Sequence, residues 1–187
     1  MSSTALLAMD LQQSMVSRIA GPSYMQRVAG ALAAARAADI PVVHITVGFR
    51  AGHPEVHPNN KMFSAIPDDA FTDSDPMAAI HADAAPLPGE PVISKNRISA
   101  FAGNDLRQVL AAKGIDHLVL TGIATSGVVL STLCEASDMD FRITVLEDAC
   151  ADPDPEVHRV LMGRPFAARA EVTTIDEWAK ALETPAI

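Results

Sequence analysis

Residues 121–132 read TGIATSGVVLST, and this stretch decides how the fold is interpreted. It follows a short apolar run, HLVL at residues 117–120, and leads into a segment with helical character. A strand that ends in a glycine-containing turn and passes directly into a helix often directs groups toward a ligand. Val128 and Val129 stand in the first helical turn, where a reactive side chain would be expected. The stretch therefore predicts a ligand-facing turn without an evident nucleophile.

Apolar strand-like segments alternate with helix-like segments along the rest of the chain. The expected strands are residues 4–10, 41–49, 91–94, 117–122, 142–148 and 171–175. The expected helices are residues 24–38, 104–113, 127–139, 155–162 and 176–182, with a short helix at 77–81 inside an irregular stretch, 50–91. Near-continuous apolar strands separated by helices are typical of a parallel sheet covered on both faces. We predict an α/β fold, a three-layer, doubly wound sheet of about six mainly parallel strands with helices on both faces.

The composition is that of a single domain over residues 1–187. The chain is 49% hydrophobic, enough to bury one core. Its net charge of −9 disfavours binding to nucleic acid or to an anionic membrane, and no apolar run is long enough to span a bilayer. The N-terminus lacks a basic segment, which argues against a signal peptide, and two cysteines favour a reduced compartment over a disulfide framework. We therefore expect a cytoplasmic protein without nucleic-acid or membrane partners.

Polar residues stand where the expected strands end. Asp10 ends the first strand, Lys95 follows the third, GIATSG at 122–127 follows the fourth, and residues 147–150 follow the fifth. Ligands of open parallel sheets bind beyond the carboxyl ends of the strands. Asp10 and Lys95 could form a charged pair inside such a cleft. Alternatively, Asp10 caps the following turn and Lys95 is a solvated surface amine.

The order of these features resembles the isochorismatase-like hydrolase superfamily. The resemblance rests on three segments: KNRISAF (95–101), VLTGIAT (119–125) and VLEDACAD (145–152). It extends from about residue 6 to about residue 178 and is weakest over 50–90. In the amidases and nicotinamidases of that family, an Asp, a Lys and a Cys form a triad in which the Cys attacks an amide carbonyl. The resemblance implies that Asp10 is the acid or base and that Lys95 supplies positive charge.

The family cysteine has no counterpart in this chain. Family sequences typically read G-[IV]-A-T-x-x-C, and counting from Gly122 places Val128 at the position of the cysteine. Because valine cannot attack a carbonyl, we predict that cysteine-dependent amidase activity is absent. Three other residues are alternative nucleophiles: Ser126, Cys134 and Cys150. Cys134 lies further along the helix, and Cys150 is expected near the cleft rim. Cys134 is better explained as a small buried side chain, and Ser126, like Thr125, as a helix cap.

The family also contains members that work without a cysteine. In isochorismatases, the resemblance implies, an acid protonates a vinyl ether and water adds to the resulting oxocarbenium ion. Asp10 would then be a general acid. Lys95 lowers the pKa of Asp10 and burial raises it, and the sequence leaves the balance open. Isochorismatases typically carry Tyr-Ala-His where this chain has residues 124–126, Ala-Thr-Ser, so isochorismate itself is not assigned.

The turn also has a backbone role in the family. The resemblance implies a cis peptide bond between Ile123 and Ala124. It also implies that the backbone around Ala124, Thr125 and Val128 forms an oxyanion-binding position, into which the N–H groups of Ala124 and Val128 point. Such donors survive the change from cysteine to valine. A carbonyl or carboxylate of a substrate could still be held there.

Other polar residues admit weaker interpretations. Arg50 and Arg97 are candidate carboxylate-binding residues, with surface or subunit ion pairs as the alternative. His53 and His57 could suggest a metal, but a solvated loop is the better interpretation, and we expect neither a metal nor another cofactor. His44 is expected to be a hydrogen-bonded core residue. Phe101 is expected to line either the pocket or a subunit contact.

Together these features predict a hydrolase that acts on a small vinyl-ether or activated-carbonyl metabolite without the family cysteine. The alternative is an inactive family member that binds a small molecule or serves as an oligomerising subunit. The resemblance further implies a homo-oligomer, a dimer or a tetramer.

Overall fold

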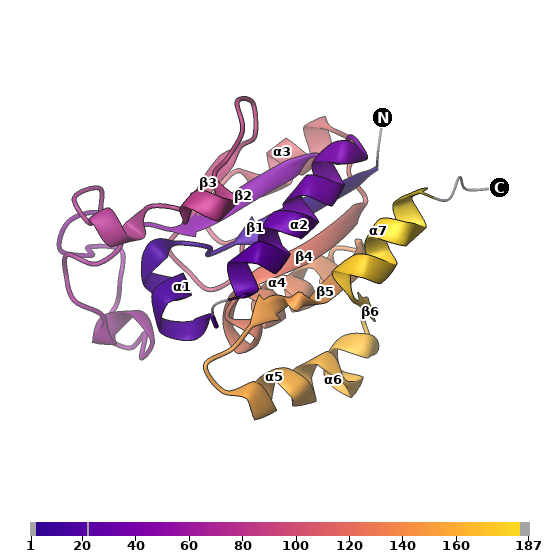
Figure 1. Ribbon diagram of the computed structural model, residues 1–187. Helices are drawn as coiled ribbons and strands as arrows, with labels where there is room; N and C mark the ends of the chain where they lie inside the picture. The colour runs from indigo at the N-terminus through magenta and orange to yellow at the C-terminus, as the bar shows by residue number, and fades with distance from the viewer. Residues whose placement is uncertain (1–2, 22, 184–187) are drawn as a thin grey trace.

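The computed structural model describes residues 3–21 and 23–183, and its centre is one six-stranded sheet with the strand order β3-β2-β1-β4-β5-β6 (Figure 1). Every neighbouring pair of strands is parallel. The strands are β1 Thr4–Met9, β2 Val42–Val47, β3 Val92–Lys95, β4 His117–Ile123, β5 Arg142–Ala151 and β6 Glu171–Thr173. The order runs outward in both directions from the central β1 and β4, as in doubly wound folds.

Helices cover both faces of this sheet, so the predicted three-layer α/β fold is confirmed (Figure 1). The helices are α1 Gln13–Ile19, α2 Tyr24–Ala37, α3 Leu106–Ala112, α4 Leu130–Asp138, α5 Pro155–Met162, α6 Arg164–Ala167 and α7 Ile175–Glu183. The stretch between β2 and β3 contains 3-10 turns at Phe63–Ala65, Pro76–Ala78 and Ala82–Ala84. The short helix expected at 77–81 is a 3-10 turn at Pro76–Ala78 and does not extend to residue 81, whereas α5 has the predicted bounds.

The core contains two large apolar clusters, one on each face of the sheet, and a smaller third cluster formed by Val47, Phe49, Phe63 and Phe71. β1 shows the division, because Leu7 and Met9 pack with α3 and α4, whereas Leu6 and Ala8 pack with α2 and α7. Successive side chains of a strand point to opposite faces, so a strand covered on both faces is apolar throughout. This burial fixes the sheet and hence the positions at which its strands end.

Several boundaries differ from the sequence prediction, and for three of them the structure shows a local reason. α3 begins two residues later than expected because the Asn104 side chain accepts a hydrogen bond from the Leu106 N–H at 3.0 Å. α4 is preceded by a π-helical turn, Thr125–Val129, in which Gly127 has non-helical dihedral angles. β5 continues to residue 151 because its pairing with β4 shifts in register between Leu120 and Gly122. Residues 147–150 therefore lie inside the strand and not beyond it.

Candidate active site

Asp10 lies immediately after β1, at the carboxyl edge of the sheet. Its backbone adopts φ 56°, and its N–H donates a hydrogen bond to the Ile45 carbonyl at 2.8 Å, so β2 holds the residue at the strand end. Only 4% of Asp10 is exposed. The carboxyl group is therefore presented from the middle of the sheet into a buried position.

Lys95 is the last residue of β3, and its side chain reaches Asp10 across the intervening β2. Nζ lies 2.9 Å from Asp10 Oδ2 and also donates a hydrogen bond to the Arg97 carbonyl at 3.1 Å. Lys95 is 3% exposed, so both members of the ion pair are buried. The structure thus brings together the two charged residues that the sequence singles out.

The two oxygens of the Asp10 carboxyl group have different surroundings. Oδ2 accepts from Lys95, whereas the buried Oδ1 has no hydrogen-bond partner among the described residues. Burial raises the pKa of Asp10 and outweighs the charge and the hydrogen bond of Lys95, which lower it. Since a raised pKa favours the protonated form, Asp10 can carry a proton on the oxygen that has no partner.

The turn after β4 has the predicted cis peptide bond between Ile123 and Ala124. Thr125 Oγ1 lies 2.8 Å from His158 Nδ1, and the Ser126 N–H donates to Asp152 Oδ2 at 2.7 Å. The predicted helix caps are therefore wrong: neither Thr125 nor Ser126 makes a side-chain capping bond to the turn. Each residue instead bonds to the segment after β5.

A cavity of about 280 Å³ joins these elements. Asp10 and Lys95 line it together with Val128, which is 2% exposed and carries only methyl groups toward the site. The segment between β2 and β3 adds an apolar wall of Met62, Phe63, Ile66 and Phe71. The site is therefore a mainly apolar pocket with one buried ion pair.

Two residues of α1 also line this cavity, and the sequence did not reveal them. Met15 and Arg18 stand one helical turn apart, so both side chains project from the same face of α1. Sequence reasoning did not predict α1, although MVSRI at residues 15–19 contains apolar residues at helical spacing. The apolar wall at 62–71 was also missed, because it lies in the segment that resembles the family least.

The two arginines proposed for carboxylate binding do not line this cavity. Arg50 is largely exposed and forms an ion pair with Glu55, with Nη1 3.1 Å from Oε1. Arg97 donates hydrogen bonds to the backbone carbonyls of Asn96 and Glu55, at 2.6 and 2.8 Å. Both guanidinium groups are thus engaged in the loops around the site.

Neither Cys134 nor Cys150 lines the cavity. Cys150 was expected near the cleft rim, and this is wrong: it lies within β5, buried in the core, with Sγ 3.9 Å from the Leu120 carbonyl. Burial raises the pKa of Cys150 to about 12, so its reactive thiolate is suppressed. Cys134 packs against the same core cluster from α4, as a small apolar side chain would.

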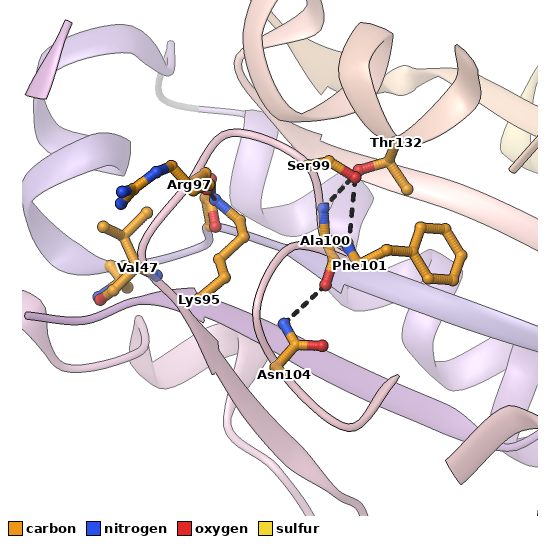
Figure 2. A network of polar contacts seen from close by, with 10 residues as sticks. Val47, Lys95, Arg97, Ser99, Ala100, Phe101, Asn104 and Thr132 are labelled. Carbon is orange, nitrogen blue, oxygen red and sulfur yellow. Dashed lines mark hydrogen bonds and ion pairs between the residues drawn. The ribbon is translucent and has the colours of Figure 1, made fainter. Parts of the chain in front are cut away.

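The loop after β3 connects the site to α4, and Figure 2 shows its contacts. Thr132 Oγ1 accepts from the Ala100 N–H at 3.0 Å, and the Asn104 side chain donates to the Ala100 carbonyl at 2.8 Å. Phe101 stacks against Phe141, with ring centroids 6.1 Å apart. Of its two expected places, the pocket wall is therefore wrong, and the subunit contact stays a prediction. These contacts hold the loop that follows Lys95 against α4.

The histidines have structural partners. His44 is buried, with Nε2 2.9 Å from Glu90 Oε2, as expected of a hydrogen-bonded core residue. His53 is also buried, with Nε2 2.8 Å from the Ala70 carbonyl, whereas a solvated loop was predicted for it. The Asn59 N–H donates to His57 Nδ1 at 3.1 Å. Each imidazole thus has a role in local structure.

The fold and the turn after β4 define an isochorismatase-like hydrolase. Residues 4–177 match the isochorismatase domain, and the chain therefore belongs to the isochorismatase family. Over 187 aligned residues it is 32% identical to the uncharacterised isochorismatase family protein YecD of Escherichia coli, with 96% of each chain covered. It is 33% identical to the ureidoacrylate amidohydrolase RutB of Variovorax paradoxus, with 79% of this chain and 68% of that protein covered.

A solved structure supports the same family. The isochorismatase family protein of Burkholderia thailandensis superposes with a TM-score of 0.85 at 27% identity, over 97% of this chain and 96% of that one. Within residues 3–21 and 23–183, no helix has both the length and the apolar character needed to cross a membrane.

Proposed function

We propose that this protein hydrolyses a small metabolite without the cysteine nucleophile of its family. Asp10 acts as the acid or base, Lys95 stabilises charge beside it, and the substrate is a vinyl ether or an activated carbonyl compound. One observation carries the proposal. The Asp10 carboxyl group lines a cavity that contains no thiol, and its buried Oδ1 has no hydrogen-bond partner among the described residues.

For a vinyl ether, the reaction needs one proton and one water molecule. Asp10 protonates the terminal carbon of the double bond, and the neighbouring carbon becomes an oxocarbenium ion. The oxygen of water bonds to that carbon, and the Asp10 carboxylate accepts the proton that the water loses. The hemiketal then breaks its original C–O bond while its hydroxyl proton passes to the leaving oxygen, which releases an alcohol and a ketone. No covalent bond to the protein forms, so a valine at position 128 is compatible with the reaction.

The surroundings of Asp10 support the role of proton donor. Burial raises the pKa of the carboxyl group despite the charge and hydrogen bond of Lys95, which increases the protonated fraction at any given pH. A general acid works only in its protonated form, so turnover should fall as pH rises through the pKa of Asp10 in the folded protein. After the proton is transferred, Lys95, 2.9 Å away, stabilises the carboxylate that remains.

Activated carbonyl compounds are the second substrate class within this proposal. The relative named ureidoacrylate amidohydrolase supports hydrolysis at a carbonyl carbon. The backbone of Ala124, Thr125 and Val128 would hold the oxyanion, and Asp10 would activate water as a base. Amide hydrolysis through a cysteine stays predicted to be absent, because loss of a nucleophile costs a factor on the order of 10⁶ in rate.

One observation favours a second function, the binding of a small molecule without turnover. The charges of Asp10 and Lys95 neutralise each other, and most other residues of the cavity wall are apolar. Such a pocket binds an apolar ligand well without reacting with it. The inactive family member therefore stays as the alternative.

The remaining elements of the proposal concern the whole protein. We propose that residues 1–187 form a single domain, that the protein is a cytoplasmic homo-oligomer, and that it needs no metal or other cofactor. Both cysteines are free, which suits a reducing compartment.

A substrate screen over vinyl ethers, esters and imides tests the function. We expect turnover of at least one class, lost in Asp10→Asn and Lys95→Ala and partly kept in Asp10→Glu. Asp138→Asn is the matched control, because this exposed residue on α4 lies outside the cavity. Thermal shifts by the same compounds without any turnover would favour the binder. Turnover that survives Asp10→Asn would exclude Asp10 as the acid or base.

A further inference from the structure

Arg18 differs from the other charged residues of the cavity wall. Lys95 already donates hydrogen bonds to Asp10 Oδ2 and to the Arg97 carbonyl. Arg18 also lines the cavity, but its side chain has no hydrogen bond or ion pair among the described residues. It is exposed and lies in the last turn of α1, which places its charge where the cavity opens to solvent.

No acidic group of the wall neutralises Arg18. Asp10 is the only carboxyl group among the cavity-lining residues, and it is paired with Lys95. Asp152 precedes Pro153 at the cavity wall, but its two oxygens accept hydrogen bonds from the backbone N–H groups of Ser126 and Asp154. Among the described residues, the cavity therefore combines an apolar wall, the hydrogen-bonded Asp10–Lys95 pair and one cation, Arg18, without a hydrogen-bond or ion-pair partner.

We propose that Arg18 determines the substrate class, and that the substrate is a small carboxylate with an apolar body. The carboxylate pairs with the Arg18 guanidinium, the body lies against the wall formed by Met15, Phe63 and Phe71, and the reacting end faces Asp10. Guanidinium and carboxylate groups match in geometry and form paired hydrogen bonds. Only the placement of the reacting end beside Asp10 rests on the proposed function.

Binding of benzoate and of benzamide tests the proposal without any turnover. The two probes share size and ring but differ in charge at neutral pH. We expect the wild type to bind benzoate more tightly, by a factor of about three to ten, because the partner is exposed and screened by water. The measurement is isothermal titration at low salt, and the preference should shrink as the salt concentration rises.

Three variants separate Arg18 from general electrostatics. Arg18→Gln should bind the two probes equally, and Arg18→Lys should keep a reduced preference for benzoate because the ammonium retains charge but not the planar fork. Arg159→Gln changes the net charge by the same amount on exposed α5, where Arg159 pairs with Glu156, and should keep the full preference. Thermal unfolding checks that each variant is folded.

The outcomes also separate this inference from the proposed function. A preference for benzoate that disappears in Arg18→Gln supports the inference, whether or not any substrate is turned over. Equal binding of both probes by the wild type, binding of neither, or a preference that persists in Arg18→Gln overturns it. Asp10→Asn should keep the preference while it abolishes turnover, so loss of turnover alone concerns only the proposed function.

Discussion

Lys95 Nζ lies 2.9 Å from Asp10 Oδ2, and the two residues come from strands that are not neighbours in the sheet. Each charge is buried, so each depends on the other for compensation. Removing one partner of a buried ion pair leaves an uncompensated charge, which typically costs about 3–5 kcal/mol. The pair therefore contributes to folding as well as to the proposed chemistry.

We expect Lys95→Met to lower the free energy of unfolding at neutral pH by several kcal/mol, toward the lower end of that range if Asp10 takes up a proton. Combining Asp10→Asn with Lys95→Met should recover much of the loss, because no buried charge remains. Urea unfolding of the wild type, both single variants and the double variant measures the coupling. Additive effects of the two changes would show that the residues do not depend on each other.

Val128→Cys should restore a thiol to the cavity with little change in side-chain volume. We expect the variant to gain one site that iodoacetamide labels much faster than Cys150, because burial holds the pKa of Cys150 at about 12. Mass spectrometry identifies the modified residue. Val129→Cys is the control, since Val129 is fully buried and lies outside the cavity wall. Equal labelling at both positions would mean that position 128 does not face the cavity.

Gly122 should not tolerate a side chain. Its φ is 146°, and a Cβ there would collide with the Met9 carbonyl group, whose carbon would lie 2.9 Å away. The Met9 carbonyl group and Gly122 belong to the backbones of the paired strands β1 and β4, so neither can move aside easily. We therefore expect Gly122→Ala to destabilise the protein by about 2 kcal/mol or more. Gly30→Ala, at an exposed position of α2 with nothing within 4 Å of the added Cβ, should stabilise by about 0.5–1 kcal/mol. Urea unfolding distinguishes the two, and a neutral Gly122→Ala would contradict the close approach.

Glu90 should make the fold sensitive to acid. Burial raises its pKa, but hydrogen bonds from Arg36, the Leu87 N–H and His44 outweigh this and lower it from 4.5 to about 2. Because the folded pKa lies below the unfolded one, the stabilisation is complete above about pH 4.5 and is lost as pH falls toward 2. The shift corresponds to on the order of 3 kcal/mol.

Glu90→Gln should therefore be less stable than the wild type at neutral pH, and the gap should close as pH falls from about 4.5 to about 2. His44, whose pKa is lowered chiefly by burial, remains in both proteins and also destabilises them as it takes up a proton. Only the difference between the two stability curves is therefore informative. Urea unfolding across this pH range measures it, and a constant gap would rule out Glu90 as the titrating group.

The residues that sequence reasoning placed correctly are those governed by short-range patterns. Apolar runs at strand length, separated by helices, specify a parallel sheet, and such a sheet collects its carboxyl ends at one edge. Asp10 and Lys95 could be assigned to that edge because each stands at the end of such a run. Val128 could be placed by its spacing from Gly122 alone.

Features that depend on packing between distant segments were missed. Cys150 was misplaced because the register shift between β4 and β5 extends β5 and turns this residue into the core. Thr125 and Ser126 looked like helix caps, but His158 and the Asp152 carboxylate bond them from the segment after β5. No local pattern encodes these contacts.

By itself, the sequence determined the layered fold, the positions of the acid and the amine at the strand ends, and the absence of a thiol from the turn after β4. Only the tertiary structure decided that burial outweighs Lys95 in setting the pKa of Asp10, and that Arg18 and the segment at 62–71 complete the cavity wall. The physical reason is that the two kinds of feature depend on residues at different separations along the chain. Backbone periodicity and strand-end position are properties of adjacent residues, whereas desolvation and cavity shape arise when segments far apart in the chain exclude water together.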